Sequence, residues 1–170
     1  MAEQLIQQFL IIKISAFQLY LLWFLLGSFT VATLSDLKYL SAQKEFLEIW
    51  ILFTLVMLAT DFYNYYYLEP NTVYLILKWG LIFIFLPFYF HFIRRIAWGD
   101  ISAKMAACSL FPPFLIVVFI ILIRIIESIT KVFWIRWRRG NYYPFMPVIF
   151  LTTLILIAAT IFISRYFSAF

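Results

Sequence analysis

Long apolar runs separated by short charged segments make up most of this chain. No charged residue occurs between Ile14 and Ser35, and about 20 apolar residues suffice for a helix to cross the hydrocarbon core of a bilayer. The pattern recurs and predicts five membrane spans, near residues 14–35, 46–60, 72–93, 100–123 and 147–164. We therefore predict an all-α, polytopic membrane protein with five to six transmembrane helices.

Prolines and a basic segment modify this plan. Pro87 lies inside the third predicted span, where a helix-interior proline favours a kink. The pair Pro112–Pro113 predicts a strong bend or a short break in the fourth span. The region 124–139 interleaves cations with aromatic residues, which predicts an amphipathic helix lying on the membrane surface.

Composition supports a membrane protein and excludes several other classes. The chain has 170 residues, of which 66% are hydrophobic and 12% charged, too few charged residues for a water-soluble domain. The net charge of +5 comes from residues that flank apolar runs, so we expect no nucleic-acid partner. Cys108 is the only cysteine and is expected to be a small buried hydrophobe. We expect one domain, residues 1–170, with no metal and no cofactor.

Counting spans places two aspartates on the same side of the membrane. We call the side reached at the end of the first span side B, and the other side A. Asp36 ends the first span and Asp100 begins the fourth, so both lie on side B. Asp61 ends the second span on side A, where we expect a solvated interfacial acid, and Lys78 is expected to snorkel to the membrane surface.

Each side-B aspartate also has an ordinary explanation. Asp36 could be a solvated acid near Lys38, and Asp100 a first-turn acid favoured by the helix dipole, with Lys104 one turn later. Gly99, directly before Asp100, removes a side chain beside the carboxylate and permits backbone or substrate to approach.

Three segments of the chain resemble the type IV prepilin peptidases and their archaeal relatives that process preflagellins. These segments are Ser35-Asp36-Leu37-Lys38-Tyr39, then Gly99-Asp100 with the small residues that follow, and Tyr143-Pro144-Phe145-Met146-Pro147. That family consists of membrane aspartyl peptidases of the GxGD type. Ala97 stands where the family has the first glycine of this motif.

The resemblance implies an aspartic endopeptidase with Asp36 and Asp100 as its catalytic pair. Its substrate would be a membrane-anchored prepilin-like or preflagellin precursor, from which it removes a short basic leader. With one cysteine and no inserted domain, the chain resembles the archaeal branch, which implies cleavage without N-methylation. Glu45 and Glu48 could attract the lysines of a leader, or could be helix-surface acids paired with Lys44.

A different class of function remains open from the sequence. The chain could be a non-catalytic membrane subunit that binds a partner or anionic lipid through the basic segment 124–139. The resemblance implies a multi-pass cell-membrane protein with its catalytic side in the cytoplasm. Positive charges are nearly balanced between the two sides if the fourth span crosses fully. A break at Pro112–Pro113 would instead return the basic segment to side B.

Overall fold

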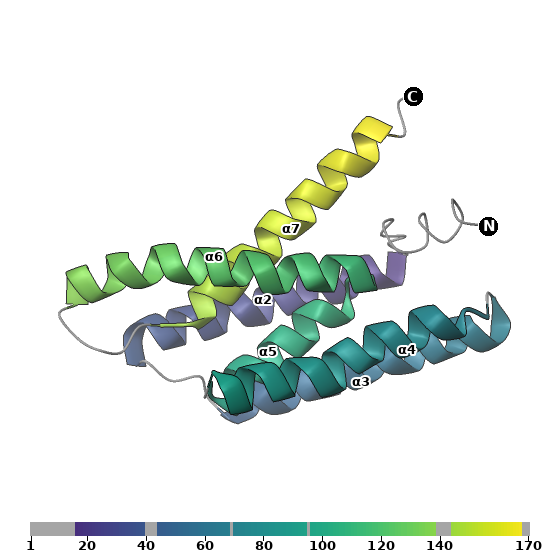
Figure 1. Cartoon of the computed structure of the whole chain (residues 1–170), viewed down its shortest axis with the longest axis horizontal. Coiled ribbons are helices and arrows are strands. Elements are labelled where there is room, and N and C mark those ends of the chain that lie inside the picture. The colour runs from purple at the N-terminus through teal and green to yellow at the C-terminus, as the bar shows by residue number, and fades with distance from the viewer. Residues whose placement is uncertain (1–15, 40–43, 69, 95, 139–143, 168–170) are drawn as a thin grey trace.

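All regular structure in the described part of the chain is helical. The computed structural model describes residues 16–39, 44–68, 70–94, 96–138 and 144–167 (Figure 1). Four helical stretches are long and apolar enough to cross a membrane, and a shorter one, Met146–Phe162, joins them. The predicted all-α polytopic membrane fold is therefore confirmed. The elements in chain order are α2 (Ala16–Tyr39), α3 (Lys44–Tyr67), α4 (Thr72–Gly80), the π-helices η1 (Leu81–Phe85) and η2 (Phe88–Ile93), α5 (Trp98–Ser109), α6 (Pro113–Arg138) and α7 (Met146–Phe167).

The bundle is apolar on its outer surface and carries ionisable groups inside. Large apolar side chains such as Trp23, Leu52 and Ile84 are exposed on the long helices. Water would make such a surface costly, whereas lipid acyl chains match it. The buried charged side chains are Asp36, Asp61, Lys78, Lys104 and Glu127. Ionisable residues inside a membrane bundle are expensive, so these five positions are the first places to look for function.

Helix α5 lies at the centre of the bundle. Residues 101–104 and 106–109 are all buried, and α5 contacts α2, α3, α6 and α7 as well as both π-helices. The small side chains of Ala103, Ala106 and Ala107 let neighbouring helices approach closely. Its 12 residues rise only about 18 Å, so α5 is shorter than the hydrocarbon core of about 30 Å.

The double proline separates α5 from α6 completely. The backbone N–H of Phe111 donates to Cys108 O at 3.0 Å and closes α5, and Ile116 N donates to Pro112 O at 3.1 Å and opens α6. Two successive prolines lack the N–H groups that would continue a helix, while Pro113 at the first helical position costs nothing. The single fourth span predicted over 100–123 is wrong, and the break at Pro112–Pro113 is confirmed.

The basic segment is part of α6. Residues 124–138 are helical, as predicted, but they continue the helix that starts at Pro113 and form no separate surface helix. Successive helices alternate in direction, and α6 runs back toward the end of the bundle where α2 and η2 end (Figure 1). An ion pair of 3.5 Å joins Glu127 of α6 to Arg94 after η2, in agreement with this direction. The second half of α6 therefore lies on side B.

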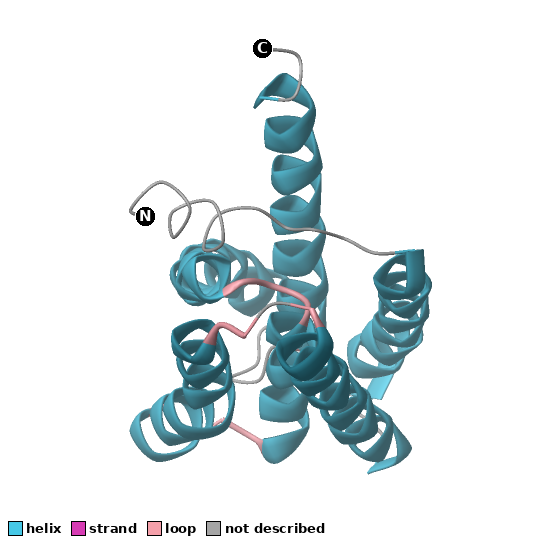
Figure 2. Cartoon of the chain, turned by 90° about the vertical axis from the view of Figure 1, so that its right-hand side faces the viewer, coloured by secondary structure: helices cyan, strands magenta, loops and turns pink. Residues whose placement is uncertain are grey.

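The third predicted span accommodates its proline by widening the helix. Pro87 lies between η1 and η2. Directly before it, Leu86 N donates to Leu81 O with the five-residue spacing of a π-helix, and Arg94 N at the end of η2 donates to Tyr89 O with the same spacing at 3.2 Å. A π-turn absorbs the hydrogen bond that proline cannot make, so the span stays continuous from Thr72 to Ile93. The last helix, α7, starts inside the bundle, and its C-terminal half projects away from the other helices (Figure 2).

Candidate active site

Asp36 is buried near the C-terminal end of α2. Its side chain is 7% exposed, and its carboxylate accepts a hydrogen bond from the backbone N–H of Met146 at 2.9 Å. Met146 is the first residue of α7, so the carboxylate lies at a helix N-terminus, where free N–H groups favour an anion. The bond joins two of the three segments that carry the family resemblance. The interpretation of Asp36 as a solvated helix-end acid is wrong.

Asp100 lies in the first turn of α5, close enough to Asp36 for their charges to interact. Burial raises the pKa of Asp100 to about 6, the Lys104 ammonium opposes this rise, and the charge of Asp36 adds to it. The helix dipole, worth about 0.3–1 kcal/mol for a first-turn acid, does not overcome the cost of burial. The structure thus brings together the two acids that the count of spans places on side B.

Gly99 borders open space rather than another part of the protein. Apart from its chain neighbours and the nearby backbone of its own helix, a Cβ atom added to Gly99 would meet no described atom within 4 Å. No packing contact of the described chain therefore requires glycine at this position. The room beside Asp100 that the sequence predicts is present and remains available to another molecule.

Glu45 and Glu48 occupy the first two turns of α3 and are exposed. Helix α3 begins at the end of the bundle where α2 ends (Figure 1), so both acids lie on side B with the aspartate pair. Their exposure leaves them accessible to a basic ligand but gives them no part in the aspartate pair itself.

Lys104 is the least expected member of the site. It is fully buried, and its Nζ atom has no hydrogen-bond acceptor among the described residues. The ammonium instead lies 4.2 Å from the ring centroids of both Phe90 and Phe145. In the sequence, the signal is a lysine placed within Ser102-Ala103-Lys104-Met105-Ala106-Ala107, a run otherwise small or apolar.

Asp61 and Lys78 form a buried ion pair away from this site. Their Oδ2 and Nζ atoms are 2.7 Å apart, and Trp79 Nε1 donates to the same carboxylate oxygen at 3.1 Å. Asp61 is therefore not a solvated interfacial acid, and Lys78, only 2% exposed, does not snorkel. Both predictions fail because each residue satisfies the other inside the bundle. The exclusion of Asp61 from the aspartate pair is confirmed.

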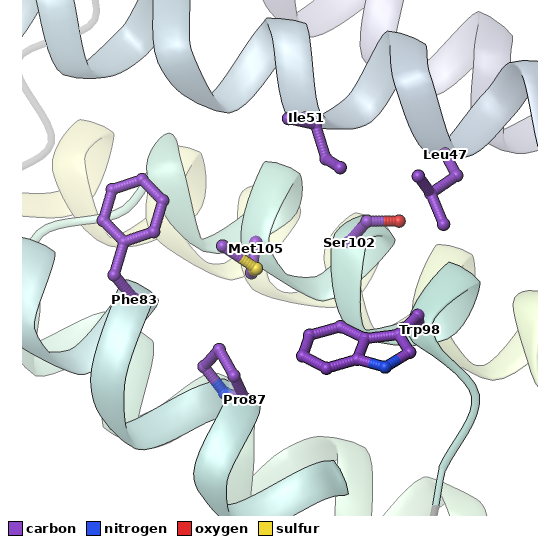
Figure 3. Close-up of a pocket in the computed structure, with 7 residues that line it drawn as sticks. All are labelled: Leu47, Ile51, Phe83, Pro87, Trp98, Ser102 and Met105. Atoms are coloured by element: carbon purple, nitrogen blue, oxygen red, sulfur yellow. The ribbon is translucent and has the colours of Figure 1, made fainter.

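An apolar pocket of about 510 Å³ borders the opposite face of α5 (Figure 3). Trp98 and Ser102 stand two positions on either side of Asp100, so they lie on the other side of the helix from its carboxylate. Ser102 Oγ already donates to Gly99 O at 2.8 Å. The pocket therefore offers mainly apolar contact, and the Ser102 hydroxyl in its lining is already hydrogen-bonded. Its lining consists of Leu47, Ile51, Phe83, Pro87, Trp98, Ser102 and Met105.

Within the described ranges, no three His, Cys, Asp or Glu side chains gather in a way that could hold a metal ion. Cys108 is fully buried, as expected for a small hydrophobe. Tyr143, the first residue of the late proline-rich segment, lies outside the described residues.

No family model, curated protein or solved structure matches this chain.

Proposed function

We propose that this protein is a membrane aspartyl endopeptidase that uses Asp36 and Asp100 as its catalytic pair. The observation that supports the proposal is that the charge of Asp36 acts on Asp100, although the two acids are 64 positions apart in the sequence. Two carboxyl groups that interact strongly titrate as a coupled pair that holds one proton over an intermediate pH range, and we propose that Asp36 and Asp100 do so. A shared proton is what acid–base hydrolysis by two carboxyls requires.

The surroundings of the two acids favour different protonation states. The Met146 N–H at the start of α7 stabilises a carboxylate on Asp36. Burial raises the pKa of Asp100 and favours its protonated form. When the pair holds one proton, we expect that proton on Asp100 and the negative charge on Asp36.

A carboxylate and a protonated carboxyl side by side can hydrolyse a peptide bond as follows. The Asp36 carboxylate removes a proton from a water molecule as its oxygen attacks the scissile carbonyl carbon. Asp100 donates its proton to the carbonyl oxygen, which gives a neutral tetrahedral intermediate. Collapse of the intermediate breaks the C–N bond. Asp36 passes the proton that it accepted to the leaving amine, and one hydroxyl of the intermediate returns a proton to Asp100 as the carboxyl product forms.

The proposed substrate is a prepilin-like or preflagellin precursor with a short basic leader before an apolar helix. The exposed acids Glu45 and Glu48 stand on side B and would attract leader lysines. The open space at Gly99 leaves room for an extended peptide beside Asp100. The product keeps an unmodified amino terminus, as the resemblance to the archaeal branch implies.

We propose that side B faces the cytoplasm of the cell membrane. Because α6 ends on side B, the basic residues of its second half join Lys38 and Arg94 there. The main described cation toward side A, Lys78, is neutralised by Asp61. An excess of Lys and Arg near the ends of spans marks the cytoplasmic side.

The test is precursor processing in cells that express the full chain together with a tagged prepilin-like precursor. Asp36→Asn and Asp100→Asn should each abolish the shift in precursor size while the protein still inserts into membranes. Near-normal processing by either variant would overturn the proposal and favour a non-catalytic membrane subunit.

The control must leave a folded bundle. Asp61→Asn alone is unsuitable, because it strands the Lys78 ammonium in the interior. The double variant Asp61→Asn/Lys78→Met removes both charges of that pair, and it should process the precursor normally.

A further inference from the structure

The amine of Lys104 lies at a place where it has no hydrogen-bonded partner among the described residues. Its side chain is fully buried in α5, and no acceptor within the described ranges reaches Nζ. An ammonium placed in a low-dielectric interior costs several kcal/mol unless nearby charges or ring faces compensate it. A residue kept at such a cost is a functional candidate.

Two aromatic rings hold the ammonium in place. Phe90 of η2 and Phe145, directly before α7, each lie with their ring centroid 4.2 Å from Nζ. Ring faces attract a cation without neutralising it. Phe145 is followed by Met146, whose N–H binds Asp36. One short segment therefore fixes both the ammonium and the Asp36 carboxylate.

Some of the charged groups near Lys104 already have ion-pair partners among the described residues. Glu127 and Arg124 of α6, and Cys108 and Asp100 of α5, are the titratable groups whose charge it feels. Glu127 is paired with Arg124 at 2.6 Å and with Arg94 at 3.5 Å. Asp100, one helical turn before Lys104, has no such ion pair among the described residues. Asp100 is therefore the acid near Lys104 whose charge an ammonium at this position would compensate.

We propose that Lys104 is a positioning residue that supplies the compensating positive charge for the Asp36–Asp100 pair; this inference rests on the function proposed above. A singly protonated pair carries one negative charge, and one ammonium makes the three groups neutral together. Neutrality lowers the cost of burying the reactive form of the pair. Lys104 touches no substrate in this role and acts through the carboxyls.

The charge of Lys104 should shift the pH at which the aspartate pair ionises in a defined direction. The Lys104 charge lowers the pKa of Asp100, against the larger effect of burial. Burial lowers the pKa of Lys104 itself to about 7, and the charge of Asp100 opposes that fall. Loss of the ammonium should therefore raise the pH at which the pair ionises. An opposite charge within about 4–6 Å shifts a carboxyl pKa by about 1–3 units.

The experiment is an infrared pH titration of the full chain in lipid nanodiscs, without substrate. The protonated-carboxyl band of the pair is assigned as the part of the spectrum that Asp100→Asn removes. Lys104→Met, in which a thioether replaces the ammonium between the two rings, should move the midpoint upward by about one pH unit or more. Lys104→Arg keeps the charge and should titrate like the wild type.

Unchanged midpoints in Lys104→Met would overturn the inference, as would equal shifts in the Met and Arg variants. Lys104→Gln replaces the Met variant if the latter does not fold. The titration needs no peptidase activity, so a failed processing assay and a failed titration are separate results. If the midpoint is unchanged but processing still requires both aspartates, the role proposed for Lys104 is wrong and the proposed peptidase function still stands.

Discussion

The Asp36 carboxylate has a structural contact and a proposed chemical role that substitutions can separate. Asparagine retains a side-chain oxygen that can accept the Met146 N–H, whereas alanine leaves this buried donor unsatisfied. Asp36→Asn should therefore keep nearly the wild-type free energy of unfolding, while Asp36→Ala loses about 1–3 kcal/mol. Unfolding by SDS titration in mixed micelles measures both. Equal losses in the two variants would show that the charge, rather than the hydrogen bond, stabilises the start of α7.

Asp100 should make stability depend on pH in a defined direction. Its folded-state pKa, about 6, lies above the usual value of an aspartate. Ionisation is therefore harder in the folded state, and the chain loses stability as the pH rises from the unfolded pKa, about 3.9, to the folded one. Asp100→Asn removes this loss.

The thermal midpoint of Asp100→Asn, relative to the wild type, should therefore rise between pH 4 and pH 8. Differential scanning fluorimetry at a series of pH values gives this difference directly. A variant that becomes less stable relative to wild type as the pH rises would mean that the Asp100 carboxylate is stabilised by its surroundings.

At the scale of elements, the Asp61–Lys78 pair couples α3 to α4. The two charges are 2.7 Å apart inside the bundle, so removal of one partner leaves the other uncompensated. Asp61→Asn or Lys78→Met should each cost about 3–5 kcal/mol of unfolding free energy, while the double variant recovers most of the loss. SDS unfolding of the four proteins gives the coupling energy. Additive losses would show that neither charge depends on the other.

The helices themselves could be predicted from the sequence, because lipid imposes a length and an apolar composition on each span. The π-helical adjustment around Pro87 and the break at Pro112–Pro113 follow from the missing N–H of proline, although the sequence did not decide between a bend and a break. Only a complete break lets residues 124–138 continue a helix that returns to side B. Once α5 ends at Ser109, α6 has the length to cross in the reverse direction.

At the scale of the whole molecule, counting spans was enough to bring Asp36 and Asp100 to one side. Counting could not show which charges are solvated, because that depends on contacts between helices distant in sequence. The sequence places Asp61 and Lys78 at the membrane surface and Lys104 in a local pair with Asp100. In the structure all three side chains are buried. The contact of Asp36 with Met146, 110 positions away, is likewise visible only in three dimensions.

The central claim is that Asp36 and Asp100 act as one catalytic unit. The direct measurement is the rate of precursor cleavage by the wild type, Asp36→Asn, Asp100→Asn and the double variant, with membrane-embedded protein and the same tagged precursor. Groups that act as a unit lose nearly all of their joint effect when either is removed. We therefore expect each single variant to be as slow as the double variant. Single variants that retain substantial activity, with losses that multiply in the double variant, would contradict it.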